Sequence, residues 1–465
     1  MKQNKAKTMD LTKGACLSRI LLFSIPILIG NVFQQIYNLI DTSLAGKYLH
    51  ESGLAAMGAT NSINSLIVGF ATGICAGFAI MVSRSVGAED KEGVKRAVCV
   101  MTAELTAVAT VFTVVSLVFL KPLLRAMNTP DTIFDMAYTY IGIILAGMPV
   151  TLAFNYGSCI LRSLGDSKTP LYCLIVGCVV NVGLDVLFTG VLRWGIKGLA
   201  LATVLAQSVT ALGSIVTLFV RYPEVRFSLS HARAGVTYYR EMFVTGFMMG
   251  AMTVIYDVGS VLLQSAINGL GDTVIAAHTA ARKILMMLLQ PLVTLGTACA
   301  TFAGQNYGAK QYERIKKGLL HTCYFSLVWS SLVVLFLWIA SEPTVRLVSQ
   351  SEDAEVISLA VMNMHINSFF YLPLGFIFPL RMGLQGFNHK VIPVLSGSIE
   401  MIVKVIGTYV LVPKYAYVGA SFSEPVTWLL CGVFLFVCFL YVIRTDLDPK
   451  IRFERLENNE ITQPV

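Results

Sequence analysis

The sequence predicts an all-α integral membrane protein with twelve transmembrane helices in two six-helix lobes related by a parallel internal repeat. Three observations support this prediction: the composition, the long apolar stretches and the placement of basic residues. Of the 465 residues, 55% are apolar and only 13% are charged, whereas soluble domains carry about a quarter charged residues. This chain therefore has too little charge to cover the surface of a soluble protein of its length.

Twelve stretches between charged residues are long enough to cross a bilayer, which takes about 20 mainly apolar residues. In the first half these stretches are 20–46, 52–83, 97–120, 136–161, 169–192 and 198–220. In the second half they are 242–271, 273–303, 318–341, 356–380, 391–413 and 415–443. The expected parts of the chain are an N-terminal lobe (1–220), a cytoplasmic inter-lobe loop (221–240), a C-terminal lobe (241–445) and a cytoplasmic tail (446–465).

The basic residues orient these stretches. If both termini are cytoplasmic, the cytoplasmic segments carry 25 Lys and Arg and the external segments carry 7. Such an excess is the positive-inside signal of membrane proteins. The net charge of +8 is dispersed along the chain, so we expect no nucleic-acid partner. The polar, basic start of the chain and the long apolar run after it do not resemble a cleavable signal peptide.

The ten cysteines do not suggest a disulfide framework or a metal site. Nine of them lie within apolar segments, and no Cys-x-x-Cys spacing occurs. We expect them to pack as small apolar side chains.

The two halves match weakly at an offset near 220 residues. The segment SRSVGAEDKEGVKRA (83–97) corresponds to GQNYGAKQYERIKKG (304–318), and LRSLGDSKTP (161–170) corresponds to LQGFNHKVIP (384–393). Six helices per half give both repeats the same orientation in the membrane, as in many secondary transporters. The expected consequence is a cleft between two bundles that opens to either side in turn. A duplicated bundle without a transport role is the alternative.

Polar side chains within the N-terminal apolar stretches could form one site. Gln34 and Asp41 are nearly two helical turns apart and share a face, and Asn181 and Asp185 are one turn apart. Asn155 and Thr203 add neutral oxygens at similar depth. This set could hold a hard cation or protons, although unrelated hydrogen bonds between helices would explain it equally well. A carboxylate inside a membrane span is by default functional because its burial is costly.

The C-terminal half has other charged residues within its apolar stretches. Asp257 has no basic neighbour in sequence, and we expect it to face a substrate cavity. Glu400 precedes Lys404 by one turn, the favourable order for an ion pair. Glu400 is therefore either part of this structural pair or a second residue of the cavity.

Four other charged residues and one proline fall inside predicted spans. Glu104 and Glu424 lie near span ends, where snorkelling to the interface would explain them. Arg282 and Lys283 must face protein or water, and no role is assigned to them. Pro26 predicts a kink in the first helix, since it removes a backbone hydrogen bond.

The whole chain resembles the multidrug and toxic compound extrusion (MATE) transporters, with greatest similarity to the bacterial DinF and MepA-like branches. The segments that carry the resemblance include PILIGNVFQQIYNLIDTSLAGKYLHESGLAAMGAT (26–60), NVGLDVLF (181–188), GIKGLALATVLAQ (195–207), IAAHTAARKI (275–284) and GLQGFNHKVIP (383–393). The resemblance implies the MATE fold and efflux of cationic or amphipathic drugs from bacteria by antiport with protons or sodium ions. It further implies a monomer in the bacterial inner membrane, in contact with lipids, that needs no cofactor besides the coupling ion.

The resemblance also implies roles for particular residues. The cation site of the DinF-like branch falls on Asp41, Asn181, Asp185 and Thr203, with Gln34 and Asn155 in supporting positions. Some members of that branch are thought to bend the first helix at the proline corresponding to Pro26, which makes Pro26 a candidate hinge. In the NorM branch, coupling carboxylates lie on helices 7 and 10. Asp257 roughly fits the first, but the stretch 356–380 contains no acid, so a NorM-type site is in doubt.

Two other functions compete with drug efflux. A lipid-linked oligosaccharide flippase has a related fold, but it usually has fourteen helices and a more cationic cleft. An intramembrane aspartyl protease would use Asp257 and Asp272, whose flanking residues resemble the YD and GxGD motifs of such enzymes. These residues lie about 22 Å apart along a continuous helix, which argues against an enzyme.

Overall fold

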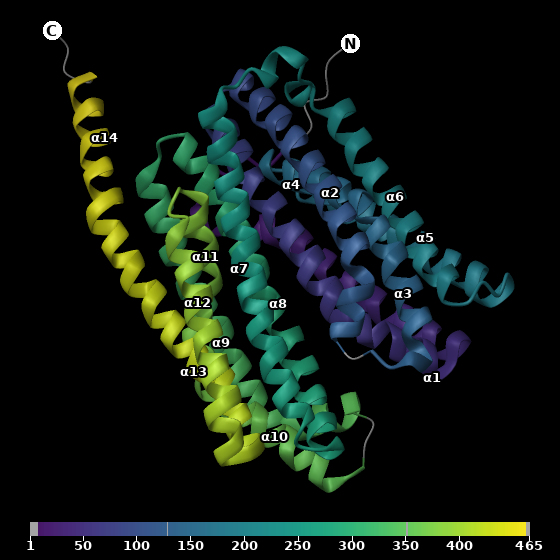
Figure 1. Ribbon diagram of the computed structural model, residues 1–465. Helices are drawn as coiled ribbons and strands as arrows, with labels where there is room; N and C mark the ends of the chain where they lie inside the picture. Colours follow the sequence, from purple (N-terminus) through teal and green to yellow (C-terminus); the bar gives the residue numbers. More distant parts are fainter. Residues whose placement is uncertain (1–7, 128, 350–351, 462–465) are drawn as a thin grey trace. The chain divides into compact units, whose positions relative to one another are not determined.

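The computed structural model describes residues 8–127, 129–349 and 352–461, which form helices joined by short turns (Figure 1). In the first half the elements are α1 (Cys16–Gly87), α2 (Lys91–Ala126), α3 (Asp131–Ala146), α4 (Met148–Ser163), α5 (Lys168–Asp185), the π-helix η1 (Val186–Val191) and α6 (Ile196–Arg221). Two short 3₁₀ turns, η2 (Pro223–Val225) and η3 (Leu229–Ala232), follow. The second half contains α7 (Val236–Asn268), α8 (Asp272–Gly308), α9 (Tyr312–Ser349), α10 (Ala354–Phe369), α11 (Tyr371–Gly386), α12 (Val391–Ile406), the π-helix η4 (Gly407–Leu411), α13 (Val412–Val442), the π-helix η5 (Ile443–Leu447) and α14 (Asp448–Ile461).

Within the described residues, nine helical segments are long and apolar enough to cross a membrane, and the bent pair α3 and α4 makes a tenth. One of the nine, Val391–Glu454, has 64 residues and covers the last two predicted stretches. The helices α10 and α11, of 16 residues each, occupy the predicted stretch 356–380. The single helix α1 contains the first two stretches, as the segments Cys16–Leu49 and Ser52–Gly87. All twelve predicted stretches therefore fall on helical segments.

Prolines in the first turn explain why two predicted stretches are divided. The axes of α3 and α4 differ by 42°, with Gly147 at the break and Pro149 in the first turn of α4. Similarly, Pro373 lies in the first turn of α11, just after the break at Phe370. Proline is tolerated in a first turn because its missing N–H would have no intrahelical partner there.

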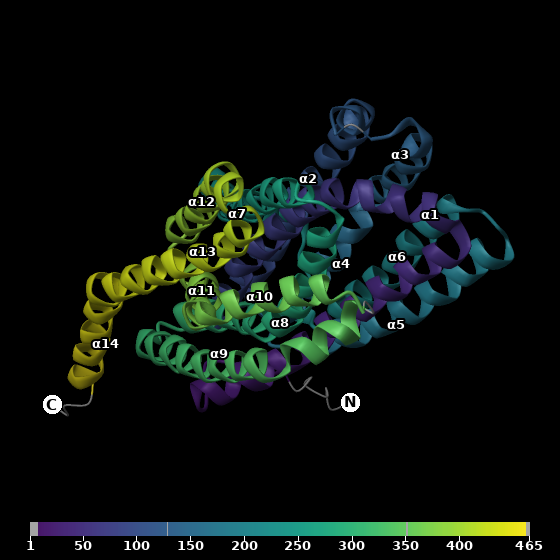
Figure 2. The same ribbon diagram turned by 90° about the horizontal axis from the view of Figure 1, so that it is seen from below.

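The described chain forms two compact units that divide inside helices. Among the described residues, the first unit consists of 8–10, 25–127 and 129–253, and the second of 11–24, 254–349 and 352–461. The boundaries fall within α1, beside Pro26, and within α7, rather than at the inter-lobe loop 221–240. In the first unit, α5 and α6 lie side by side in both views (Figures 1 and 2).

Small residues allow close helix contact in the first unit. A Cβ atom added at Gly77 would lie 2.6 Å from the Gly246 Cα, and one added at Gly73 would lie 2.9 Å from the Gly250 Cα. The second span of α1 and the first part of α7 therefore meet backbone to backbone. Such contacts are typical of membrane helices, which associate through packing of small residues.

The two motifs that repeat between the halves have structural roles in their own units. Asp166, in the turn before α5, accepts hydrogen bonds from the Thr169 backbone N–H at 3.0 Å and from the Tyr222 hydroxyl at 2.7 Å. Burial and this hydrogen bond raise the pKa of Tyr222. In the second unit, Asn306 donates to the Leu11 carbonyl at 3.2 Å, and Arg314 donates to the Gly14 carbonyl at 2.8 Å. These contacts hold the segment 11–24 against α8 and α9.

Candidate ion-coupling site

Two carboxyl groups from different helices meet in the interior of the first unit. Asp41 lies on α1, and Asp185 is the last residue of α5. Asp41 is 8% exposed and Asp185 is fully buried. Their carboxyl groups lie close enough to interact electrostatically. Two buried carboxyl groups this close cannot both be ionised at low cost unless a proton or a cation compensates their charge.

The polar atoms around this pair are poorly satisfied by the protein. Among the described residues, five buried side-chain atoms here have no partner in a conventional hydrogen bond: Asp41 Oδ1, both amide atoms of Asn181 and both carboxyl oxygens of Asp185. Buried polar groups are normally paired, so such a cluster requires an explanation. Four of the five are oxygens, the ligand type that hard cations prefer. The residues present therefore fit either a shared proton or a small hard cation such as Na⁺.

The site differs from a transition-metal site. Within the parts of the chain that the structure describes, no three His, Cys, Asp or Glu side chains lie close enough together to hold a metal ion. The neighbours of Asp41 and Asp185 are an amide and hydroxyl groups instead. Neutral oxygen donors of this kind suit an ion that must be released as readily as it is bound.

Two tyrosines complete the site, and the sequence analysis missed both. Tyr37 lies one turn before Asp41 on α1 and is close enough to Thr203 and to both aspartates to interact with them. Thr203 also donates to the Leu199 carbonyl at 3.1 Å. Tyr140, on α3, interacts with the same two aspartates. The four-residue spacing of Tyr37 and Asp41 could have revealed the first tyrosine, whereas nothing in the sequence places Tyr140 there.

A cavity of about 260 Å³ lies next to this pair within the first unit. Four of the six predicted site residues line it: Gln34, Asn155, Asn181 and Thr203. Asp41 and Asp185 are absent from its wall, but Asn181 belongs to both the wall and the buried cluster. The structure therefore brings the predicted residues together as a buried carboxyl pair with a polar cavity beside it.

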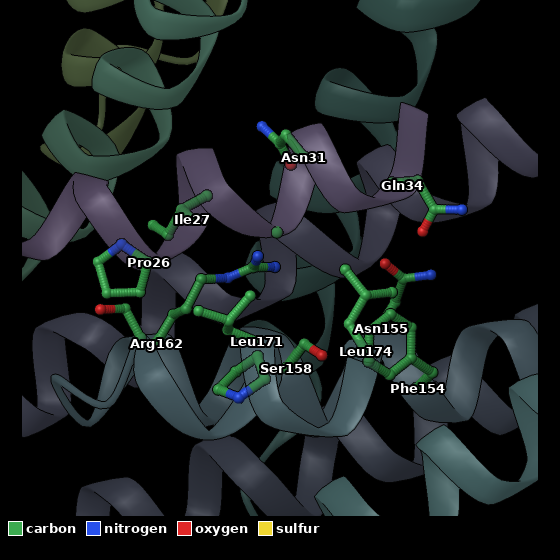
Figure 3. Close-up of a pocket in the computed structure, with 13 residues that line it drawn as sticks. Pro26, Ile27, Asn31, Gln34, Phe154, Asn155, Ser158, Arg162, Leu171 and Leu174 are labelled. Atoms are coloured by element: carbon green, nitrogen blue, oxygen red, sulfur yellow. The ribbon is translucent and has the colours of Figure 1, made fainter. Parts of the chain in front are cut away.

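A second cavity, of about 170 Å³, is lined by Pro26 (Figure 3). Gln34 and Asn155 line both cavities, and Figure 3 shows their amides pointing toward one another from α1 and α4. Asn155 also donates to the Thr151 carbonyl at 2.9 Å. The candidate hinge Pro26 thus lines a cavity that shares Gln34 and Asn155 with the cavity beside the carboxyl pair.

In the second unit, Glu400 has a different partner from the one expected. The carboxylate of Glu400 lies 3.1 Å from Arg381 Nη2, whereas Lys404 donates to the Ser260 hydroxyl at 2.7 Å and lies 4.0 Å from the centre of the Tyr256 ring. The expected Glu400–Lys404 ion pair is therefore wrong. Sequence spacing identifies neighbours on one helix only, and Arg381 lies on a different helix, α11.

Glu424 and Arg282 also form an ion pair between two helices. Arg282 Nη1, on α8, lies 3.9 Å from Glu424 Oε1, on α13. Snorkelling is therefore not needed to explain Glu424, and Arg282 has a partner. Lys283 is exposed, and Asp257 is half-buried on α7. Glu104 has one buried carboxyl oxygen with no hydrogen-bond partner among the described residues.

Comparisons with known proteins agree with this architecture. The MatE family model matches residues 26–187 and 242–410, one match in each half of the chain. The probable multidrug resistance protein YpnP of Bacillus subtilis is 27% identical over 378 residues, which cover 81% of this chain and 83% of the relative. The FAD transporter of Shewanella oneidensis is 24% identical over 440 residues, 90% of this chain and 94% of the relative. A MATE crystal structure in the bent conformation superimposes with a TM-score of 0.88 at 22% identity, covering 97% of this chain and 99% of that one.

The helical spans, the duplicated halves and the buried carboxyl pair define a multi-pass membrane transporter rather than an enzyme. Because the family model matches most of the chain, in two corresponding blocks, the family assignment does not depend on any single motif. The protein belongs to the MatE family of multidrug efflux transporters.

Proposed function

We propose that the protein exports cationic or amphipathic small molecules by alternating access in antiport with protons or sodium ions. The burial of Asp41 and Asp185 close to each other carries this proposal. Coupled export requires a group that binds the driving ion in one conformation and releases it in another. A buried carboxyl pair with unpartnered oxygens is suited to this task, because its charge balance changes with every ion that enters or leaves.

The same residues would bind either ion. For a proton, Asp41 and Asp185 would form one coupled site that shares the proton between the two carboxyl groups. For Na⁺, the ligands would be Asp41, Asn181, Asp185 and Thr203. In both cases Gln34 and Asn155 would line the approach through the polar cavity.

The remaining assignments extend this proposal. The protein would work as a monomer in the bacterial inner membrane, surrounded by lipid, with both termini in the cytoplasm. The lobes of the transporter would be residues 1–220 and 241–445. Pro26 would act as the hinge of α1, and Asp257 and Glu400 would contribute to substrate binding in the C-terminal lobe.

A flavin nucleotide is the second candidate substrate. The FAD transporter of Shewanella oneidensis matches nine-tenths of this chain, and the second unit buries two cationic side chains, Arg381 and Lys404. Lys404 hydrogen-bonds to a serine rather than to a carboxylate, and Glu424 is the acid that interacts with it electrostatically.

Transport into liposomes tests the proposal directly. The purified protein is reconstituted, the proton and sodium gradients are imposed separately, and the uptake of ethidium and of FAD is followed. We expect ethidium accumulation with at least one gradient, and its loss in Asp41→Asn. Accumulation of FAD but not ethidium would select the second candidate, and accumulation of ethidium with neither gradient would refute antiport.

A further inference from the structure

A groove of about 340 Å³ lies within the first unit, between α2, α4 and α6. Its wall includes Thr106 and Thr110 from α2, Pro149 from α4 and Phe219 from α6. The groove shares no lining residue with the two cavities at the candidate ion-coupling site. Ion coupling at that site therefore does not account for this groove.

The polar side chains in the wall of the groove are already hydrogen-bonded within the protein. They are three threonines and one tyrosine. The Thr106 hydroxyl donates to the Thr102 carbonyl at 2.7 Å, and the Thr110 hydroxyl donates to the Thr106 carbonyl at 2.9 Å. The Thr102 hydroxyl lies 2.8 Å from the Tyr156 hydroxyl. A ligand that needs hydrogen bonds would lose those it makes to water and gain few in return, whereas a hydrocarbon chain would lose none.

The groove opens on the outer surface of the helices and has the depth of one bilayer leaflet. Thr106 and Thr110 are exposed, and the exposed surface of α2 continues with Val114 and Val118, which are 54% and 64% exposed. An apolar exposed surface on a membrane span is typical of contact with lipid. Phe219 lies two residues before the end of α6, whereas Thr110 lies near the middle of α2. The groove therefore extends from the end of a span to its middle, about 15 Å of a hydrocarbon core about 30 Å thick.

Two arginines lie at the end of the groove where α6 ends. Arg226 Nε donates to the Phe219 carbonyl at 2.7 Å, and Arg226 Nη2 donates to the Val220 carbonyl at 3.3 Å. Arg221 and Arg226 are both exposed, and Glu224 is the one acid between them in the sequence. Neither arginine forms an ion pair with a carboxylate among the residues that the structure describes. Basic side chains at the end of a span attract anionic lipid headgroups.

We propose that this groove binds one acyl chain of an anionic phospholipid, with the phosphate of the lipid at Arg221 and Arg226. The apolar wall matches the chain, and the arginines match the headgroup, because a guanidinium can donate two parallel hydrogen bonds to a phosphate. The lipid would come from the leaflet that meets this end of α6. Its second chain would remain in the bilayer.

The test is photo-crosslinking of the full-length protein in vesicles that contain phosphatidylglycerol with a diazirine in the middle of one acyl chain. After illumination and proteolysis, mass spectrometry should find the label mainly on residues 102–110 and 149–156, above its level on the exposed stretch 111–118. Thr106→Phe should fill the groove. The loss of contact with as few as two methylene groups corresponds to about a tenfold loss of affinity, so labelling of 149–156 should fall about tenfold.

Val118→Phe is the matched control, because it adds the same ring to the exposed surface of the same helix outside the groove; it should leave the labelling unchanged. Even labelling of 102–118 in the parental protein would overturn the proposal without any variant, and so would unchanged labelling in Thr106→Phe. Loss of the label with excess ethidium would show that the groove binds drugs instead.

A second probe tests the headgroup. Phosphatidylcholine with the same diazirine chain should label the groove less than phosphatidylglycerol does, and the double variant Arg221→Gln/Arg226→Gln should remove this difference. Equal labelling by the two probes in the parental protein would overturn the assignment of an anionic lipid.

Discussion

Arg381 and Glu400 form a buried ion pair that joins α11 to α12, with 3.1 Å between Arg381 Nη2 and Glu400 Oε1 and exposed side-chain fractions of 7% and 4%. The two charges compensate each other in an environment with little water. The main effect of this ion pair on stability is not the attraction between the two charges. It is that each charge compensates the other, because an unpaired buried charge would be costly.

Removal of one partner of this ion pair should therefore destabilise the protein more than removal of both partners. We expect Arg381→Met to lower the free energy of unfolding by about 3–5 kcal/mol, the usual cost of stranding a buried charge. The double variant Arg381→Met/Glu400→Leu should recover most of this loss. Thermal unfolding in detergent measures both. Arg282→Met, which breaks a longer and more exposed pair, is the matched control and should cost less. A double variant as unstable as the single one would show that the ion pair itself supplies the stability.

Asp41→Asn and Asp185→Asn should each abolish coupled efflux while leaving a folded, membrane-inserted protein. An amide fills the same space as a carboxyl group but cannot gain or lose the proton that coupling requires. Binding of substrate should persist, because coupling is a free energy separate from binding. Dye efflux and dye binding to the purified protein measure the two effects.

The neutral neighbours of the pair provide the controls for this prediction. Thr203→Ala and Tyr37→Phe remove a hydrogen bond but no charge, so we expect reduced rather than abolished efflux. If both aspartate variants pump at the parental rate, coupling occurs elsewhere, and Asp257 with Glu400 becomes the better candidate.

Gly77→Ala should destabilise the first unit. Its new Cβ would lie 2.6 Å from the Gly246 Cα and 2.8 Å from the Thr245 carbonyl oxygen, so one helix must move. Gly58→Ala is the control on the same helix, because a Cβ there has no neighbouring atom within 4 Å. Alanine favours helix over glycine by about 1 kcal/mol, so Gly58→Ala should be neutral or stabilising. Similar melting temperatures for the two variants would contradict the close contact.

The orientation of the chain can be tested with single-cysteine labels in a cysteine-free variant. We expect labels at Lys47, Lys197 and Lys414 to react with an impermeant maleimide added outside cells. Labels at Ala88, Ala232 and Ala309 should react only after permeabilisation. Opposite results at any two of these positions would rule out the proposed topology.

Asp257→Asn should weaken the efflux of dications more than that of monocations. The loss of one attractive charge in a partly desolvated cavity is worth on the order of 1–4 kcal/mol per substrate charge. Transport assays with mono- and divalent dyes of similar size measure the difference. Equal losses for neutral and cationic compounds would instead make Asp257 a structural residue.

The spans and the main site residues could be predicted from the sequence because each rests on local information. A run of apolar residues specifies a membrane helix by itself, and spacing along one helix places Gln34 with Asp41 and Asn181 with Asp185. The proximity of Asp41 to Asp185 could be expected only from the resemblance to the transporter family, since nothing local relates α1 to α5.

Partners on different helices were missed for the same reason. Spacing suggested Lys404 as the partner of Glu400, but the pairing with Arg381 depends on how α11 packs against α12. The contact of Tyr140 with the carboxyl pair likewise depends on the packing of α3. The breaks at Gly147 and Phe370 depend on local proline chemistry that a hydropathy pattern does not record.

The π-helical turns η1 and η4 end the fifth helix of each half, directly after Asp185 in the first and three residues after Lys404 in the second. A π-helical turn takes one more residue than an α-helical turn and is often found at functional sites. The two halves now carry opposite charges beside this turn. The internal repeat therefore extends to the backbone geometry of the fifth helix, whereas the ionisable side chain near the turn differs between the two halves.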